Sequence, residues 1–148
     1  MMVRRALLLM LLAASAGCGM LRVNILGHAM SPTLRDGESA FATRQFETLE
    51  RGEIVAFRYP KDESKSFVKR IVGMPGDRIE SKAGRILIDG AALTESYVVE
   101  TNRSGDTWGP VVLGADEYFM MGDNRSNSSD SRHWGAVRRD AIWAKLFD

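Results

Sequence analysis

The sequence has few of the residues that cross-link a small protein or hold a metal ion. Its 148 residues include one cysteine, which excludes an internal disulfide, and two histidines, which argues against a His/Cys metal site. Twenty Lys and Arg against nineteen Asp and Glu leave a net charge of +1, so the chain lacks the basic excess typical of nucleic-acid-binding proteins. With 45% hydrophobic residues, it has enough apolar side chains for one packed domain.

Long uncharged apolar runs are scarce too, and the clearest one lies at the N-terminus. Ala6–Ala16 follows Arg4 and Arg5, and a short basic segment before an apolar stretch is typical of a secretory signal or a membrane anchor. From Ala6 to Leu21 the run has 16 residues, fewer than the roughly 20 of a full membrane span. A buried core helix is the alternative, although the run shows no polar face.

We interpret residues 1–22 as an N-terminal anchor helix or signal-like segment, and residues 23–148 as one separate domain. The two N-terminal arginines should stay in the cytoplasm, which places this domain on the extracytoplasmic side of the membrane. Cys18 follows three small residues, as in a lipoprotein processing site, but Ser15 stands where such sites usually carry Leu. An uncleaved anchor and a lipid-anchored Cys18 both stay open.

The remaining sequence predicts short strands separated by turns. Alternating, β-rich segments predict strands at Glu53–Tyr59, Ser66–Val72, Arg78–Ser81, Arg85–Ile88, Val111–Leu113, Tyr118–Met121 and Ile142–Phe147. Met74–Asp77 is a strong turn signal, and Ala83-Gly84 suggests a hairpin. No later segment has a helical period over three turns. We therefore predict an all-β fold, a partly closed antiparallel β-barrel-like core preceded by the anchor helix.

Lys69 lies inside one of these predicted strands, and two environments are open to it. Alternation puts it on the same face as Phe67 and Ile71. If that face is the core, burial lowers the pKa of the ammonium group and makes a neutral amine available as a general base. If the strand lies at the edge of a sheet, Lys69 points into water and guards the edge against aggregation.

Residues 121–135 are rich in polar hydrogen-bonding groups. Six of these fifteen residues are Ser or Asn, and two Asp and two Arg are among the others. Asp130 and Arg132 are two residues apart, so they can pair on one side of an extended segment. A solvated, turn-rich loop is the alternative, although such a loop would rarely need Trp134.

Four segments, in order along the chain, resemble the sequence boxes of the type I signal peptidases, membrane-anchored serine proteases that use a Ser/Lys dyad. The boxes Ser-Met-x-Pro-Thr-Leu, Arg-Gly-Asp-Ile-Val-x-Phe, Lys-Arg-x-x-Gly-x-Pro-Gly-Asp and Gly-Asp-Asn-Arg-x-Asn-Ser-x-Asp-Ser-Arg are similar to residues 29–34, 51–57, 69–77 and 122–132. The resemblance extends over residues 23–148, and the N-terminal anchor with its orientation agrees with it.

The resemblance implies roles for the matching residues. Lys69 would be the general base that takes the proton of the nucleophile and later delivers it to the leaving amine. Ser128 would hydrogen-bond to Lys69 and orient it. Asp130 and Arg132 would form a structural ion pair behind the site.

The resemblance also implies a substrate pocket that Met30 lines in part, with the backbone N–H of Ala29 in the oxyanion hole. The implied substrates are secreted preproteins bearing signal peptides, cut after small-x-small residues because a shallow pocket excludes larger side chains. Membrane lipid would be a second partner, since these substrates arrive embedded in lipid. We expect a monomer with no cofactor, no metal and no nucleic-acid partner.

One departure from the family pattern bears directly on activity, because Ala29 occupies the position of the nucleophilic serine. A methyl group has no oxygen to attack a carbonyl, so we expect the chain as written to be inactive through this residue. Ser31 is two residues away, roughly 6–7 Å along an extended chain, and would need a rebuilt loop to meet Lys69. His28 is interpreted as a polar residue at the rim.

Two further departures are Gly27, where many bacterial members carry a small hydroxyl residue, and Ser126, at a position that is usually Asp. The leading interpretation is a signal peptidase scaffold whose nucleophile has been replaced, by nature or by engineering. The alternatives are a binding protein that holds signal peptides or other precursors without cutting them, a processing peptidase of a conjugation or secretion apparatus, and a lipid-anchored structural β-domain.

Overall fold

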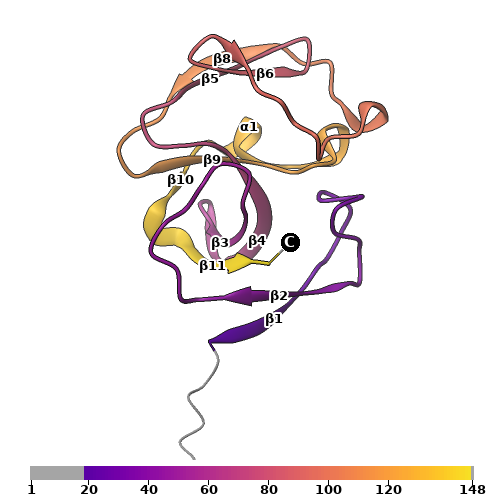
Figure 1. The fold of residues 1–148 in the computed structure, drawn as a ribbon, viewed down its shortest axis with the longest axis vertical. Coiled ribbons are helices and arrows are strands. Elements are labelled where there is room, and N and C mark those ends of the chain that lie inside the picture. The colour runs from indigo at the N-terminus through magenta and orange to yellow at the C-terminus, as the bar shows by residue number, and fades with distance from the viewer. Residues whose placement is uncertain (1–18, 148) are drawn as a thin grey trace, which may run out of the picture.

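The computed structural model describes residues 19–147, which form two antiparallel sheets (Figure 1). The larger sheet has the order β1-β2-β11-β3-β4-β9-β10, with β1 at Met20–Asn24, β2 at Ser39–Thr43, β3 at Ile54–Tyr59, β4 at Asp62–Gly73, β9 at Glu117–Met121, β10 at Val137–Arg138 and β11 at Ile142–Leu146. The smaller sheet has the order β7-β6-β5-β8, with β5 at Arg78–Lys82, β6 at Arg85–Ile88, β7 at Ala91–Ala92 and β8 at Trp108–Val112.

Helical structure in residues 19–147 is confined to short turns. They are α1 at Ser131–Trp134 and the 3₁₀ turns η1 at Glu100–Asn102, η2 at Arg125–Asn127 and η3 at Arg139–Ala141. None of the helices in this described part is long and apolar enough to cross a membrane. Residues 1–18, which hold most of the expected anchor and Cys18, lie outside the described residues, and β1 already begins at Met20.

The all-β prediction is confirmed. The predicted partial closure into a barrel is wrong, because both sheets of the described residues are open. The seven predicted strands correspond to β3, β4, β5, β6, β8, β9 and β11, whereas β1, β2, β7 and β10 are not predicted. In the described residues the larger sheet runs from β1 to β10 without the two ends pairing, and the smaller sheet is open as well. Alternation within a strand reports which face is buried, but it carries no information on which strands pair.

Strand β4 is the longest strand, and its second half lies inside the larger sheet. It pairs with β3 on one side, with Val55 opposite Lys69, and with β9 on the other, with Met121 opposite Arg70. Because successive side chains of a strand point to opposite faces, Lys69 and Arg70 enter different environments. This strand therefore supplies two neighbouring cations to two sides of the sheet.

Apolar clusters lie on both sides of β4 and join the two sheets. The first gathers around Phe57, Ile71 and Trp134, and the second around Ile25, Met30 and Ala144. The third joins the larger sheet to the smaller one, which lies across β9 in Figure 1; its members are Val72, Ile79, Ile86, Leu113, Phe119 and Met121. The loop that follows β1 therefore rests on the second cluster, beside β4.

The predicted β5–β6 hairpin turns at Ala83 and Gly84, with φ angles of 49° and 78°. A Cβ atom on Gly84 would lie 1.6 Å from the Ser104 carbonyl oxygen, so no other residue fits. The hairpin is thereby held close to the segment that leads into β8.

Candidate active site

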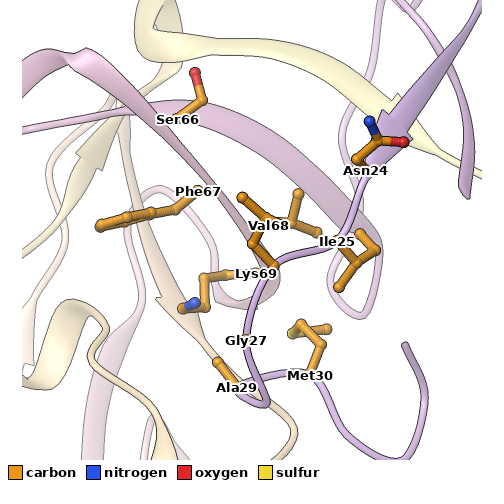
Figure 2. A pocket seen from close by; sticks show the side chains of 10 residues that line it. Asn24, Ile25, Gly27, Ala29, Met30, Ser66, Phe67, Val68 and Lys69 are labelled. Carbon is orange, nitrogen blue, oxygen red and sulfur yellow. The ribbon is translucent and has the colours of Figure 1, made fainter. Parts of the chain in front are cut away.

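A groove of about 200 Å³ separates the loop after β1 from β4 (Figure 2). Two stretches of the chain line it: Asn24, Ile25, Leu26, Gly27, Ala29 and Met30 on one wall, and Ser66, Phe67, Val68 and Lys69 on the other. Figure 2 shows the Lys69 side chain leaving β4 on the same side as Phe67 and ending near Ala29 in this view. The structure thus brings Ala29, Met30 and Lys69 to one groove.

The Lys69 side chain is buried in an interior strand, which excludes the edge-strand alternative. Lys69 is 7% exposed, and its Nζ lies 5.4 Å from the centre of the Phe67 ring. Burial lowers the pKa of its ammonium group, and the negative charge of Asp130 opposes that effect only in part. Within residues 19–147 its Nζ has no ion pair and no hydrogen bond. The neutral amine, the form that accepts a proton, therefore forms more readily at this site than it does in water.

The loop that carries Ala29 is held by two hydrogen bonds from Asn124. The Asn124 backbone N–H donates to the Ala29 carbonyl at 2.9 Å, and its side-chain Nδ2 donates to the His28 carbonyl at 3.1 Å. In the described part of the chain, the Ala29 N–H donates to no protein acceptor. A fixed backbone with a free N–H is what an oxyanion-binding position requires.

Gly122, at the end of β9, allows this loop to approach Ser128. A Cβ atom at Gly122 would lie 2.3 Å from Ser128 Oγ and 2.4 Å from the Ala29 carbonyl oxygen. The absence of a side chain at Gly122 therefore allows the Ser128 hydroxyl and the Ala29 carbonyl to approach its backbone closely. The Ser128 hydroxyl donates to Asp130 Oδ2 at 2.7 Å, and no hydrogen bond joins it to Lys69 within residues 19–147.

Asp130 is fully buried and is the centre of a polar cluster. It forms an ion pair with Arg132, with Nε and Oδ1 2.9 Å apart, and it accepts the Gly122 N–H at 3.1 Å as well as the Ser128 hydroxyl. It also caps α1 by accepting the Arg132 N–H. Burial by itself would raise the pKa of Asp130, but the hydrogen bonds and charge of Arg132, together with the other donors, outweigh it and lower the pKa.

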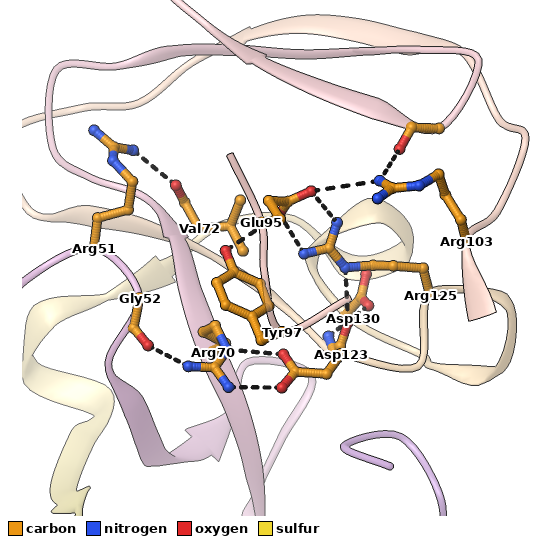
Figure 3. Close-up of polar contacts among 12 residues, drawn as sticks. Arg51, Gly52, Arg70, Val72, Glu95, Tyr97, Arg103, Asp123, Arg125 and Asp130 are labelled. Carbon is orange, nitrogen blue, oxygen red and sulfur yellow. Dashed lines mark hydrogen bonds and ion pairs between the residues drawn. The ribbon is translucent and has the colours of Figure 1, made fainter. Parts of the chain in front are cut away.

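A second buried ion pair joins Arg70 of β4 to Asp123, which follows β9 (Figure 3). Arg70 is bound to Asp123 by two hydrogen bonds, Nε to Oδ1 at 2.8 Å and Nη2 to Oδ2 at 2.7 Å, and its Nη1 donates to the Gly52 carbonyl at 2.6 Å. Asp123 Oδ2 also accepts the Thr33 hydroxyl at 2.5 Å. One carboxylate therefore joins three of the four sequence boxes.

A third buried pair supports the polar segment from the side of the smaller sheet. Arg125 donates to Glu95 Oε1 at 2.5 Å and Oε2 at 3.1 Å, and its Nε donates to the Gly122 carbonyl at 2.8 Å. The Arg70 guanidinium stacks on the Tyr97 ring at 4.0 Å, so this pair and the Arg70 pair are connected (Figure 3). Glu95 and Tyr97 lie outside every sequence box, and no sequence signal points to them.

His28, Ser31 and Ser126 are not among the residues that line the groove. The Ser31 N–H donates to the His28 carbonyl at 3.1 Å, and the Ser31 carbonyl accepts from Asn102 Nδ2 at 3.4 Å. The side chains of His28 and Ser126 are exposed. Residues 19–147 contain no group of three or more His, Cys, Asp or Glu residues placed to hold a metal ion.

Comparisons with known proteins identify the family to which the chain is similar. The family model described as signal peptidase, peptidase S26, matches residues 1–147. The chain is 35% identical over 128 residues to a probable signal peptidase I-2 of Synechocystis sp., covering 80% of this chain and 57% of that protein. It is 36% identical over 118 residues to a signal peptidase I of Bacillus amyloliquefaciens, covering 72% and 62% of the two chains.

A solved structure is similar as well. The crystal structure of a signal peptidase I from Enterococcus faecalis V583 matches with a TM-score of 0.61 and 25% sequence identity, covering 70% of this chain and 100% of that chain. The present chain spans about six-tenths of the length of the curated relatives that it matches.

Proposed function

Because this chain belongs to the signal peptidase, peptidase S26 family, we propose that its domain is an endopeptidase scaffold that binds secreted preproteins at small-x-small sites. The observation that carries the proposal is the shared groove, in which Ala29, at the nucleophile position, and the buried Lys69 line one space. The lowered pKa of Lys69 supports a role as a general base. The signal peptidase names of the relatives support the substrate class.

The chain as written holds such a substrate without cutting it through residue 29, since a methyl group cannot form an acyl-enzyme. With serine at position 29, Lys69 Nζ would take the hydroxyl proton while the serine oxygen attacks the scissile carbonyl. The Ala29 N–H, free of protein acceptors, would bind the resulting oxyanion. The protonated Lys69 would then give its proton to the leaving amine, and a water activated by the same amine would release the acyl group.

The expected cellular setting is part of the same proposal. Residues 1–22 would anchor the chain in the membrane, with the domain on the extracytoplasmic side, where membrane-embedded precursors present their cleavage sites. The domain would act as a monomer in contact with lipid, and it would need neither metal nor cofactor. The ion pair of Asp130 and Arg132 would keep Ser128 in position to orient Lys69 once a substrate is bound.

The experiment that tests the proposal is preprotein cleavage in detergent, followed by mass spectrometry. It compares the chain as written with Ala29→Ser, Ala29→Ser/Lys69→Ala and Ala29→Ser/Lys65→Ala. Lys65 is the matched control, because it lies on the same strand with its side chain 64% exposed. We expect cleavage after a small-x-small site by Ala29→Ser and by the Lys65 control, and a loss of about 10²–10⁴-fold without Lys69.

Each other outcome has a definite meaning. Cleavage by the chain as written would show that another group is the nucleophile, and it would overturn the assignment of position 29. Binding of the signal peptide with no cleavage by any variant would favour the second candidate, a protein that holds precursors without cutting them. The observation in favour of that candidate is Ala29 itself.

A further inference from the structure

A second groove, of about 390 Å³, meets the first at one residue of β4. Arg44, Arg58, Glu63, Ser66 and Trp143 line it. Ser66 lines the first groove as well, so the two grooves join at this position. Figure 2 shows Ser66 at the end of the first groove that is remote from Ala29 and Met30. Val68 of the first groove and Trp143 of the second pack against the same apolar cluster.

The spacing along β4 sets how far the second groove lies from the reacting atoms. Ser66 and Lys69 are three residues apart on one strand, or about 10 Å. An extended peptide that follows β4 from the position of Lys69 therefore reaches Ser66 after about three of its own residues. The lining beyond Ser66 would meet side chains about four to six residues from the scissile bond.

The charged side chains that line the second groove favour an anion. The Arg44 guanidinium lies 5.5 Å from the centre of the Trp143 ring, and Arg58 Nη2 donates to the Asp140 carbonyl at 2.8 Å. Within residues 19–147 no carboxylate lies within ion-pair distance of either guanidinium. Glu63 is the one acid of the lining, so the lining residues carry a net positive charge.

The chemistry of these groups matches a carboxylate. A guanidinium offers paired N–H donors that fit the two oxygens of a carboxylate, and the face of a neighbouring indole ring attracts the cation. The indole N–H of Trp143 already donates to Ser66 Oγ at 3.2 Å, so the ring is held in place where the grooves meet. We propose that this groove is a subsite for an acidic side chain of the preprotein, four to six residues from the scissile bond; the proposal rests on the proposed function.

The test measures equilibrium binding to the full chain as written, because Ala29 leaves the bound peptide intact. Fluorescent peptides with one small-x-small site carry a single Asp, moved from two to eight residues away on either side of that site. Peptides with Asn at the same positions are the controls. We expect the Asp peptides to bind about 3–5-fold more tightly than the Asn peptides at four to six residues on one side only. The preference should decline as salt is added.

Variants of the lining give effects of opposite sign. Arg44→Gln and Arg58→Gln should each reduce the ratio between Asp and Asn peptides toward one, and Glu63→Gln should increase it. Lys61→Gln, which changes the same amount of charge outside the groove, should leave the ratio unchanged. The Nε1–H resonance of Trp143 should shift with the peptides that show the preference, since this group lies in the lining.

Three results would overturn the proposal in different ways. Peptides that bind equally well with Asp and Asn at every position would remove the subsite while leaving the proposed function intact. Failure of every peptide to bind would remove both. If vesicles of an anionic phospholipid, rather than the Asp peptides, shift the Trp143 resonance in an Arg44-dependent way, the groove binds a lipid headgroup and the peptide subsite is wrong.

Discussion

Lys69 and Arg70 are neighbours on β4 and are almost equally buried, at 7% and 4% exposed. Their surroundings nevertheless differ, because in the described part of the chain only Arg70 is bound to a carboxylate. Arg70 is bound on several sides by the Asp123 carboxylate and the Gly52 carbonyl. Lys69 faces a groove and an aromatic ring, with no ion pair within residues 19–147. Arg70 is therefore held by its partners, whereas burial disfavours the charged form of Lys69.

Removing the partner of Arg70 should have the largest effect on stability. Asp123→Ala leaves a buried guanidinium without its carboxylate, and we expect a loss of about 3–5 kcal/mol in the free energy of unfolding, measured by urea denaturation. The control is Asp140→Ala, whose pair with Arg138 is formed by side chains that are 75% and 66% exposed. That variant should stay within about 0.5 kcal/mol of the parent chain. If Asp123→Ala lost no more stability than Asp140→Ala, the ion pair of Arg70 with Asp123 would not contribute to the free energy of unfolding.

Adding one methyl group between the two regions should have the next largest effect. In Gly122→Ala the new Cβ collides with Ser128 Oγ and the Ala29 carbonyl, one of which is backbone. We expect about 1–3 kcal/mol of destabilisation and, in the Ala29→Ser background, a loss of cleavage beyond what the fraction unfolded explains. Gly105→Ala is the control, since a Cβ there meets no atom within 4 Å. A Gly122→Ala variant that cuts normally would show that the approach of these groups is not needed.

The pH dependence of cleavage should report Lys69 and not Arg70. In the Ala29→Ser variant the rate should rise about tenfold per pH unit while Lys69 is protonated, and then level off. Because burial lowers the Lys69 pKa, the midpoint should lie below the ordinary value of 10.5. The profile of kcat/KM against pH measures it. A midpoint at or above that value would contradict the assignment of Lys69 as the base.

Replacing Lys69 by a neutral side chain should give the smallest effect, and its sign is opposite to that of Asp123→Ala. Lys69→Met should raise the free energy of unfolding by about 0.5–2 kcal/mol at neutral pH, because a buried site that disfavours charge is filled by an apolar chain. The unfolded chain binds the Lys69 proton up to about 10.5, so the parent gains stability as pH rises from the folded pKa toward that value.

The advantage of Lys69→Met should therefore be full below the folded pKa of Lys69 and should vanish near pH 10.5. Lys65→Met is the matched control, and it should change stability by less than about 0.5 kcal/mol because its side chain is exposed. Thermal denaturation of the three proteins over a pH series measures both effects. A destabilised Lys69→Met variant would mean that Lys69 stabilises the fold.

The positions of seven of the eleven strands in residues 19–147 follow from local patterns in the sequence, but the pairing of the strands does not. Glu53–Tyr59 alternates and becomes β3, whereas β1 at Met20–Asn24 continues the apolar N-terminal run and so lacks a pattern of its own. β2 at Ser39–Thr43 is built largely of small residues, which signal no element. The order of the larger sheet depends on contacts such as that of β11 with β2 and β3, which no local pattern encodes.

The candidate site is likewise predicted only in part: the sequence indicates which residues belong to it but not how they are buried or paired. The box resemblance places Ala29, Lys69 and Ser128 in one site, but alternation alone leaves the burial of Lys69 open. That burial follows from the position of β4 between β3 and β9, a long-range fact. The sequence does not predict the role of Glu95, because its ion pair with Arg125 joins two segments that are 30 positions apart in the chain. The roles of Ser128 and Asp130 stay predictions.

The hydrogen bonds that hold the loop of Ala29 have a consequence for the order of folding. Ala29 and Lys69 belong to the first half of the chain, but the groups that hold this loop, Asp123 and Asn124, act across 90 and 96 positions. Contacts of such separation form slowly, because a long loop must close before they stabilise anything. During synthesis, the residues that line the groove therefore leave the ribosome well before Asp123 and Asn124, which hold the loop of Ala29 in place. The loop of Ala29 therefore reaches its final position beside β4 only once β9 and the segment after it have docked.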